Sequence, residues 1–358
     1  MRIGLDCRSI YKGMGGIGRY AWCLLSELAA LDRENEYVCY FTHLEPHAPI
    51  ELPERFRIRK FKAGMIDERF DQLILPALLE EDRLDVYHNS TFSVPAIRTS
   101  AKTVATIHDV VFRRHPDLVE PGLRAYLDRA TRRACRTADR IVTVSEFSKK
   151  ELCELYPVSS ERVQVIHNGV STPPLVQSRM SQGKSNVLYV GSIEPKKNIE
   201  LLLKAFSLLR EGPLRLVLAG SRGCYPLEQR IKEFGLGDSV VALGYVSESE
   251  LESLYANALV FVYPSHYEGF GLPPLEAMAR GVPTVVSNSS SLPEVVGEGA
   301  VLVDPKDAEG LAKILVRLAK DEHERRTWSE RGKVRAATMT WKTCARTHLD
   351  LYQSLLTQ

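Results

Sequence analysis

Short apolar runs alternate with amphipathic segments along most of the chain. The runs are rich in β-branched and aromatic residues and are bounded by polar turns, which is typical of strands. They lie at residues 2–5, 37–41, 85–88, 103–107, 140–144, 187–190, 214–219, 240–243, 259–263, 284–286 and 300–303. Segments with helical spacing lie between them, such as 18–30, 198–210 and 307–318. This alternation predicts an α/β fold, with doubly wound parallel sheets covered by helices on both faces.

Residues 170–185 interrupt this alternation. The stretch V-S-T-P-P-L-V-Q-S-R-M-S-Q-G-K-S is polar, contains two prolines and has no apolar period, as expected of a linker. A chain of 358 residues is long for one hydrophobic core, which favours two domains. We therefore expect a first domain at 1–170, a linker at 171–185, a second domain at 186–340 and a final helix at 341–358.

Composition narrows the class of protein. A hydrophobic content of 44% and a charged content of 26% are ordinary for a globular protein, and a net charge of +2 argues against nucleic acid as a partner. The seven cysteines are odd in number and never form C-x-x-C, so we expect reduced side chains and a cytoplasmic setting. The chain begins in a strand pattern without a signal-peptide pattern, and no apolar run approaches the roughly 20 residues that span a bilayer.

The most informative motif is E-G-F-G-L-P-P-L-E, which begins at Glu268 and ends at Glu276. It joins the strand at 259–263 to a helix whose start is marked by two prolines. The backbone N–H groups of Gly269, Phe270, Gly271 and Leu272 are then able to point at an anion. Carboxylates beside such an anion site suit hydroxyl groups, as in a nucleotide sugar. The alternative is that Glu276 only complements a helix start and Glu268 is a solvated loop residue.

At this motif the chain resembles the retaining glycosyltransferases of family 4, which have the GT-B fold. The resemblance implies two doubly wound domains facing across a cleft, with a C-terminal helix that crosses back to the first. It also implies that Glu268 binds donor-sugar hydroxyls and that Glu276 binds the nucleotide ribose. No cofactor is expected, because the nucleotide sugar is itself the substrate. No metal is expected either, because no D-x-D pair follows a strand as in metal-dependent sugar transferases.

The segment G-S-I-E-P-K-K-N follows the first strand of the second domain. In the family, this segment carries an arginine and a lysine for the donor pyrophosphate. Lys197 matches the lysine, whereas Ser192 stands at the arginine position, and Lys196 is a candidate to compensate. Together with G-G-I-G-R-Y-A near the start, the segment resembles bacterial surface-polysaccharide mannosyltransferases and implies GDP-mannose as donor. The alternative for the two lysines is a solvated helix start.

The first domain offers two further candidate sites. Gly15 and Gly16 lie in a glycine-rich loop, G-M-G-G-I-G, that resembles the family loop over the donor pyrophosphate, with Arg19 on the following helix. As a dinucleotide fingerprint the loop is weak, because no acid follows the second strand, which disfavours a dehydrogenase. A purely structural turn is the alternative.

His108 follows the strand at 103–107, and carboxyl ends of parallel strands form ligand sites. The matching family residue contacts the donor sugar. Asp109 is expected to orient the ring or to cap the following loop, and His88 is a second candidate for the same edge of the sheet.

Three other segments carry expectations. Tyr245 and Val246 match a family turn along the nucleotide base, and Ser247 with Glu250 predicts a capping box. Ser145 is either a cleft residue or a helix N-cap. The predicted helix at 122–138 is arginine-rich and is a candidate for an anionic membrane surface, with a solvated helix face as the alternative. Its arginines are Arg124, Arg129, Arg132, Arg133 and Arg136.

Together these features predict a retaining, metal-independent hexosyltransferase. We expect His108, Glu268 and Lys197 to be the catalytic residues, with the departing phosphate assisting as base. The acceptor is expected to be a glycan or a polyprenyl-linked glycan of O-antigen or exopolysaccharide synthesis. The alternatives are a UDP-glucose or UDP-galactose transferase of the same fold and a non-catalytic sugar-nucleotide-binding protein.

Overall fold

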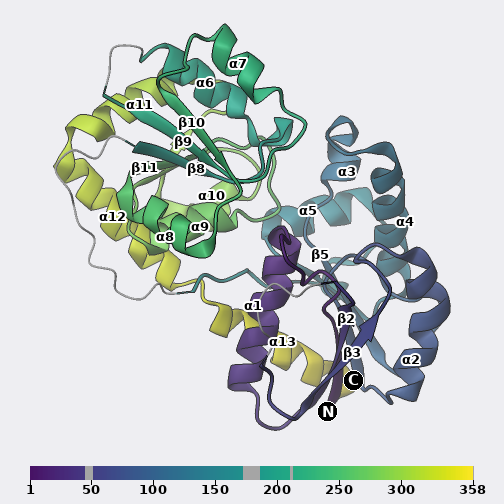
Figure 1. Ribbon diagram of the computed structural model, residues 1–358. Helices are drawn as coiled ribbons and strands as arrows, with labels where there is room; N and C mark the ends of the chain where they lie inside the picture. Colours follow the sequence, from purple (N-terminus) through teal and green to yellow (C-terminus); the bar gives the residue numbers. More distant parts are fainter. Residues whose placement is uncertain (45–50, 172–185, 210–212, 358) are drawn as a thin grey trace. The chain divides into compact units, whose positions relative to one another are not determined.

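The computed structural model describes residues 1–44, 51–171, 186–209 and 213–357 (Figure 1). It divides the chain into two compact units. The first consists of Met1–Gly169 together with Trp341–Gln358, and the second consists of Val170–Thr340. Nearly all of the expected linker, residues 172–185, lies outside the described part of the chain.

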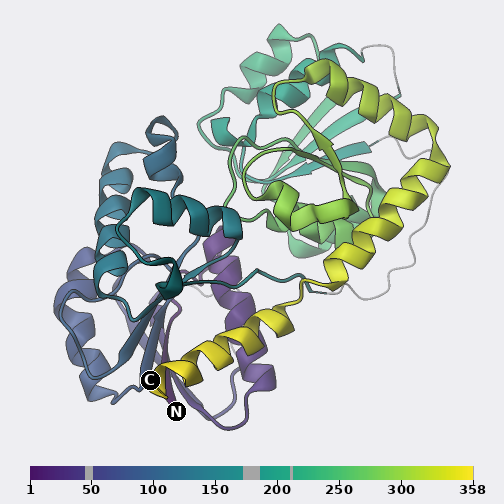
Figure 2. The same ribbon diagram turned by 180° about the vertical axis from the view of Figure 1, so that it is seen from behind.

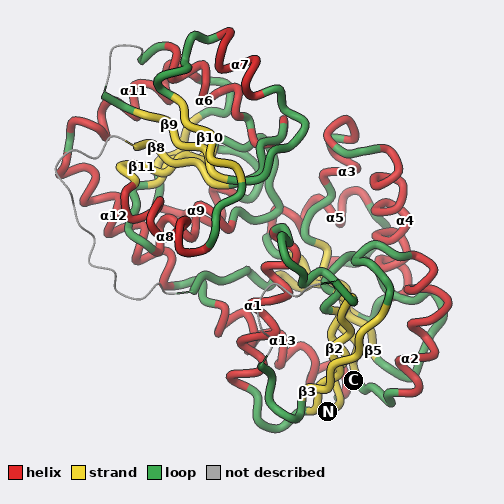
Figure 3. The backbone as a smooth tube through the Cα atoms, in the orientation of Figure 1, coloured by secondary structure: helices red, strands yellow, loops and turns green. Residues whose placement is uncertain are grey.

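The first unit contains a seven-stranded sheet among its described residues. Its strands are yellow in Figure 3, and all neighbouring strands are parallel. The order β3-β2-β1-β4-β5-β6-β7 is doubly wound, with its switch point between β1 and β4. The strands are β1 (Arg2–Asp6), β2 (Glu36–Thr42), β3 (Phe56–Phe61), β4 (Val86–Asn89), β5 (Lys102–Ile107), β6 (Arg140–Thr143) and β7 (Val163–Val165). The pattern of apolar residues does not predict β3 and β7, which are the two edge strands.

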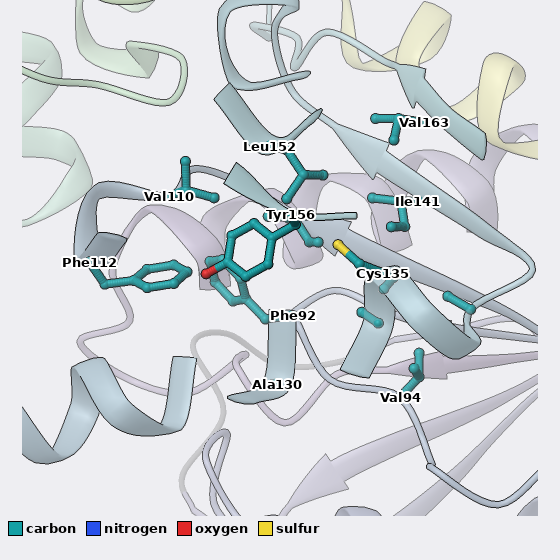
Figure 4. Close-up of a cluster of buried hydrophobic side chains, with 14 of the residues drawn as sticks. Phe92, Val94, Val110, Phe112, Ala130, Cys135, Ile141, Leu152, Tyr156 and Val163 are labelled. Carbon is teal, nitrogen blue, oxygen red and sulfur yellow. The ribbon is translucent and has the colours of Figure 1, made fainter. Parts of the chain in front are cut away.

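Helices cover both faces of this sheet, as predicted (Figures 1 and 2). They are α1 (Gly16–Leu31), α2 (Leu75–Glu81), α3 (Val111–Arg114), α4 (Pro121–Thr137), α5 (Glu146–Leu155) and α13 (Trp341–Leu356), with the single turns η1 (Phe70–Ile74), η2 (Pro116–Leu118) and η3 (Ser160–Arg162). On one side of the unit, Cys135 of α4, Ile141 of β6, Leu152 of α5 and Val163 of β7 point into one buried cluster (Figure 4). Burying each such side chain stabilises the fold by about 1.5–3 kcal/mol.

The helix α13 packs beside α1, although more than half of the chain separates them in sequence (Figures 1 and 2). A buried chain of hydrogen bonds joins it to the sheet. The chain runs through Tyr352, His88, Thr106, Tyr20, His348 and Cys344. At one end, Nδ1 of His88 lies 2.6 Å from the Tyr352 hydroxyl; at the other, Nδ1 of His348 lies 2.8 Å from the Cys344 carbonyl.

A carbonyl only accepts, so Nδ1 of His348 carries the proton and Nε2 accepts from the Tyr20 hydroxyl at 3.0 Å. Burial lowers the pKa of His348 to about 4, which keeps the ring neutral, with the proton on Nδ1 and the acceptor at Nε2. The final helix is thus fixed to the first unit by directed polar bonds as well as by apolar packing.

The second unit contains a six-stranded sheet among its described residues, again entirely parallel. Its order is β10-β9-β8-β11-β12-β13, which places β8 beside β11 at the switch point. The strands are β8 (Asn186–Val190), β9 (Arg215–Ala219), β10 (Val240–Gly244), β11 (Ala258–Tyr263), β12 (Thr284–Ser287) and β13 (Val301–Val303). The helices are α6 (Ile199–Ser207), α7 (Leu227–Glu233), α8 (Glu248–Asn257), α9 (Leu272–Ala279), α10 (Leu292–Val296), α11 (Ala308–Lys320) and α12 (Glu322–Ala337), with the turns η4 (Pro195–Lys197) and η5 (Gly297–Gly299).

Candidate functional site

The switch point of the second sheet brings together two loops that are far apart in sequence. The loop 191–198 leaves the carboxyl end of β8, and the loop 264–271 leaves the carboxyl end of the adjacent strand β11. In open parallel sheets, ligands bind at this edge and at this point. Both motifs singled out from the sequence lie on these two loops.

Lys197 and Glu268 form a buried ion pair between the two loops. The Lys197 ammonium donates to Oε1 of Glu268 at 2.6 Å and to the Tyr263 hydroxyl at 2.8 Å. The two charged side chains are only 11% and 12% exposed. The sequence assigns these residues to separate parts of a donor, and the structure places them in contact. Tyr263, at the end of β11, is a member of the cluster that the sequence analysis missed.

The pKa values of the pair move apart. Burial alone would lower the pKa of Lys197, but the charge of Glu268 raises it above its ordinary value. Burial would raise the pKa of Glu268, but Lys197 and Lys196 lower it. Both groups are therefore charged throughout the neutral pH range. This cluster offers a cation for a phosphate and a carboxylate for hydroxyl groups within one hydrogen-bond length.

The remaining residues of the loop 191–198 are more open. Lys196 is 27% exposed on its side chain, and its ammonium lies 3.9 Å from Oε2 of Glu194. Ser192, which replaces the family arginine, accepts a bond from the Tyr189 hydroxyl at its backbone carbonyl. Ile193 forms a parallel bridge with Arg222, which follows β9. The structure thus brings a guanidinium-bearing residue alongside the segment in which Ser192 stands.

Asn198 stands directly before α6 but does not cap it with its side chain. Its backbone is left-handed, with φ of 57°, and its side chain makes no capping bond. The amide Nδ2 donates instead to the carbonyls of Pro264, at 3.0 Å, and Pro305, at 2.8 Å. The bond to Pro264 ties the lysine loop to the loop that carries Glu268, and the bond to Pro305 ties it to the segment after β13.

The glycine turn before α9 has the predicted shape, with Leu272 as the first helical residue. Gly271 has φ of 114°, and a Cβ atom there would lie 2.7 Å from Leu292, so only glycine fits. The Phe270 side chain and Gly269 are both buried. The two prolines that follow have no N–H, so any anion contact is limited to the turn itself.

Glu276 lies one turn inside α9 rather than at its first residues. It is only 7% exposed, and its carboxylate accepts from the Tyr255 hydroxyl at 3.3 Å. A buried carboxylate one turn past the helix start does not fit the alternative of a surface acid that complements the helix dipole.

The turn after β10 is open. Gly244 has φ of 73°, and the Tyr245 side chain is 68% exposed, with Val246 half-buried beside it. Ser247 and Glu250 form the predicted capping box at the start of α8.

In the first unit, Gly15 and Gly16 are exposed at the start of α1, and a Cβ atom on either would meet nothing within 4 Å. Gly18 differs, because its Cβ would lie 2.4 Å from the Ser9 carbonyl oxygen. Arg19 is half-buried on the same helix. Packing therefore explains Gly18 and leaves the two preceding glycines without a structural requirement.

His108 stands at the carboxyl end of β5 and is 9% exposed. Its Nε2 donates to the Ser90 carbonyl at 2.9 Å, and its ring lies edge-to-face with Tyr20 at 4.9 Å between centroids. Burial lowers the pKa of His108, so the ring is neutral and Nδ1 is an acceptor. Asp109 caps the following loop by accepting from the Val111 N–H at 3.0 Å.

Two candidates of the first unit have structural roles. His88 is not a site residue, because both of its ring nitrogens are bonded inside the core, to Tyr352 and Thr106. A strand-end position predicts exposure only where no other element covers that end. Ser145 is the N-cap of α5 and accepts from the Ser148 N–H.

The arginine-rich helix α4 is partly neutralised by its surroundings. Arg129 and Arg133 both pair with Glu68, at 3.1 and 2.7 Å, and Arg132 pairs with Asp128 at 3.2 Å. Arg136 is exposed, and Arg124 donates to the Pro116 carbonyl. Fewer positive charges are therefore available on this helix than the sequence indicates.

No helix in the described ranges has both the length and the apolar content for crossing a bilayer. Within the same ranges, no three side chains of His, Cys, Asp or Glu are grouped to hold a metal ion.

Comparison with known proteins defines the class. The model of glycosyltransferase family 4 matches residues 14–173, and the model of glycosyl transferases group 1 matches residues 176–335. The chain therefore belongs to the family 4 glycosyltransferases of the GT-B fold.

Relatives and solved structures agree with this class. The chain is 33% identical to an O-antigen chain mannosyltransferase B of Escherichia coli, over 99% of this chain and 100% of the relative. Sucrose-phosphate synthase from Thermosynechococcus elongatus has the same fold, with a TM-score of 0.81 and 23% identity over 100% of this chain and 99% of that one. The Anabaena protein HepE, in complex with UDP and glucose, has a TM-score of 0.74 and 18% identity over 99% and 100%.

Proposed function

We propose that this glycosyltransferase moves mannose from GDP-mannose to a glycan or polyprenyl-linked acceptor, retaining the anomeric configuration, in the synthesis of a surface polysaccharide. The contact between Lys197 and Glu268 at the switch point carries the proposal. The name of the Escherichia coli relative supports mannose and an O-antigen-type product. Exopolysaccharide synthesis is a product class of the same chemistry.

In this proposal, the leaving diphosphate is held by Lys197, by Lys196 and by the turn at 269–272. Negative charge develops on the departing phosphate while positive charge builds at the anomeric carbon. Cations fixed in a buried site stabilise such charge more strongly than they would in water. No step requires a metal ion, and activity should persist in excess EDTA.

The donor sugar is positioned by carboxylate and imidazole acceptors. Glu268 accepts from sugar hydroxyls on the side of its carboxylate that Lys197 does not occupy, and Nδ1 of the neutral His108 accepts another. Glu276 accepts from the ribose, and Tyr245 and Val246 lie along the base. Gly15 and Gly16 allow the backbone to approach the pyrophosphate closely. We propose that the acceptor attacks the face from which the phosphate leaves, with that phosphate as base.

Thermal unfolding with candidate donors tests the proposal. A ligand that binds only the native state raises its stability, so GDP and GDP-mannose should raise Tm more than UDP-glucose or UDP-galactose at equal concentration. Glu276→Gln removes a charged acceptor, which should weaken GDP binding by about 1.5–3 kcal/mol. A larger shift with UDP-hexoses would assign the donor to the HepE-like alternative. Binding without transfer or slow hydrolysis of any donor would identify a non-catalytic protein.

We also propose an anionic membrane surface as a partner, through α4, because a polyprenyl-linked acceptor lies in a bilayer. Each basic residue near such a surface contributes about 1 kcal/mol, an attraction that salt weakens. The protein should co-sediment with anionic but not neutral vesicles at low ionic strength. Replacing the exposed Arg136 by Gln should reduce this more than the same change at Arg133, which is 19% exposed and pairs with Glu68. Equal binding by all variants would make α4 a solvated face.

A further inference from the structure

Serines of one loop are bonded along the whole segment that carries Glu268. The run S-N-S-S-S at 287–291 begins at the last residue of β12 and continues into the loop that follows it. The hydroxyl of Ser287 donates to the Ser265 carbonyl, and that of Ser289 donates to the His266 carbonyl. On its other side, the same segment is bonded to the lysine loop, where the His266 N–H donates to the Lys196 carbonyl at 2.9 Å.

Two of these serines bond the backbone of Glu268 itself. Oγ of Ser290 accepts from the Glu268 N–H at 2.9 Å. Oγ of Ser291, fully buried, lies 2.9 Å from the Glu268 carbonyl oxygen and 2.8 Å from that of Phe270. One hydroxyl hydrogen is thus shared between the two carbonyls that flank Gly269. Both polar backbone groups of Glu268 are bonded to side chains from a single loop.

The geometry of Ser290 indicates that this arrangement is held against a local preference. Its φ is +53°, a left-handed conformation that residues other than glycine and asparagine seldom adopt. Such residues persist where the surroundings over-determine them, and they concentrate at functional sites. Here the surroundings are the bonds from Ser290 to Glu268 and from its own hydroxyl to the Ser289 carbonyl at 2.8 Å.

We propose that Ser290 and Ser291 are positioning residues that set the placement of the Glu268 carboxylate for the donor sugar. This inference rests on the proposed role of Glu268. The carboxylate is bonded by Lys197, and its backbone by the two serines, so the glutamate is fixed from both ends. The serines touch no ligand themselves. A small displacement of a group that orients a substrate reduces turnover by up to about a hundredfold.

The test is a double-mutant cycle with Glu268→Ala. Ser290→Gly keeps the left-handed backbone and removes the Ser290 hydroxyl. Ser291→Ala removes the buried Ser291 hydroxyl. Each change alone should lower kcat/KM for GDP-mannose at least about tenfold. In the Glu268→Ala background, each should lower it less than about twofold, because the group that the serine positions is gone. Ser291→Thr keeps a hydroxyl and should recover most of the activity.

Ser287→Ala is the matched control, because Ser287 is equally buried and bonds a carbonyl of the same segment. Its effect should be the same in both backgrounds. Free GDP, measured by calorimetry, should bind both serine variants within about threefold of the wild type. Losses that are equal in both backgrounds, or GDP binding that weakens as much as turnover, would make the serines merely structural. If Glu268→Ala itself keeps full activity, the proposed function of Glu268 fails, and the inference with it. If Glu268→Ala is impaired but the cycle is additive, only the inference fails.

Discussion

At the scale of single residues, the glycines of the first loop separate a packing requirement from a binding one. Gly18 faces the Ser9 carbonyl at a distance that no real Cβ atom tolerates, whereas Gly15 and Gly16 face open space with backbone angles that alanine adopts. Within four positions, packing therefore requires one glycine and does not require the other two. Only the open glycines are expected to matter for a ligand.

Alanine substitutions should reveal this difference. Gly18→Ala should destabilise the protein by about 1–3 kcal/mol through overpacking. Gly15→Ala and Gly16→Ala should leave stability unchanged or raise it by about 0.4–1 kcal/mol, because the unfolded chain loses freedom. Both should nevertheless weaken GDP-mannose binding, since a methyl group intrudes where the pyrophosphate is proposed to lie. Urea unfolding and calorimetry measure the two effects, and unchanged donor affinity in both variants would contradict the proposed contact.

The paired residues Lys197 and Glu268 show what the sequence does and does not predict about the site. Each is recognisable from its own motif, but they stand 71 residues apart, and their contact depends on β8 lying beside β11. Strand order does not follow from periodicity. Ser290 and Ser291 appear in the sequence only as part of a polar run after a strand. Hydrogen bonds from serine hydroxyls to the backbone leave no periodic pattern by which these two residues could be recognised. Tyr263 reads as the last apolar residue of a strand.

At the scale of elements, the central strands of both sheets are predictable, whereas the two edge strands of the first sheet are not. The central strand β11, A-L-V-F-V-Y, is wholly buried and reads as a continuous apolar run. β3 has the sequence F-R-I-R-K-F, with half of its positions exposed, and β7 is three residues long. An edge strand with basic residues resists pairing with another chain, and the same residues mask it from a hydrophobic pattern. The prediction that His88 is a site residue is wrong because α13, which covers this end of the strand, comes from the far end of the sequence.

Acid should loosen α13 through its buried histidine. The pKa of His348 is about 4 in the folded protein and about 6.5 in an unfolded chain. Between these values the unfolded chain binds a proton that the folded one refuses, so stability falls as pH decreases below 6.5. The slope is about 1.4 kcal/mol per pH unit for one such group. His348→Gln should reduce the slope of the free energy of unfolding against pH by about that amount. The same change removes the bond to Tyr20 and so lowers stability at pH 7.

The measurement is urea unfolding between pH 4.5 and 7.5, followed by tryptophan fluorescence. In a Trp328→Phe background, Trp22 and Trp341 report on the first unit alone. His43→Gln, at an exposed position of the same unit, is the control and should leave the slope unchanged. An acid slope that is identical in the His348 variant and the wild type would refute the role assigned to this ring.

At the scale of the whole molecule, the second unit is an insertion within the first. The chain leaves the first unit after Gly169 and returns to it at Trp341. The two crossings lie together, because Val170 forms a parallel bridge with Thr340 and its N–H donates to the Met339 carbonyl at 3.0 Å. The alternating pattern alone predicts two sheets, whereas the return of the final helix to the first unit is implied only by the family resemblance.

This arrangement has a consequence for how the protein is made. A ribosome delivers the whole of the second unit as one uninterrupted segment, which is able to fold as soon as it emerges. The first unit has to wait, because Tyr20 and His88 lack their bonds to His348 and Tyr352 until residues 341–356 have been translated. The half of the protein that is synthesised first is therefore the half whose core is completed last. During that interval, the nascent chain exposes the apolar face of α1 that α13 later covers.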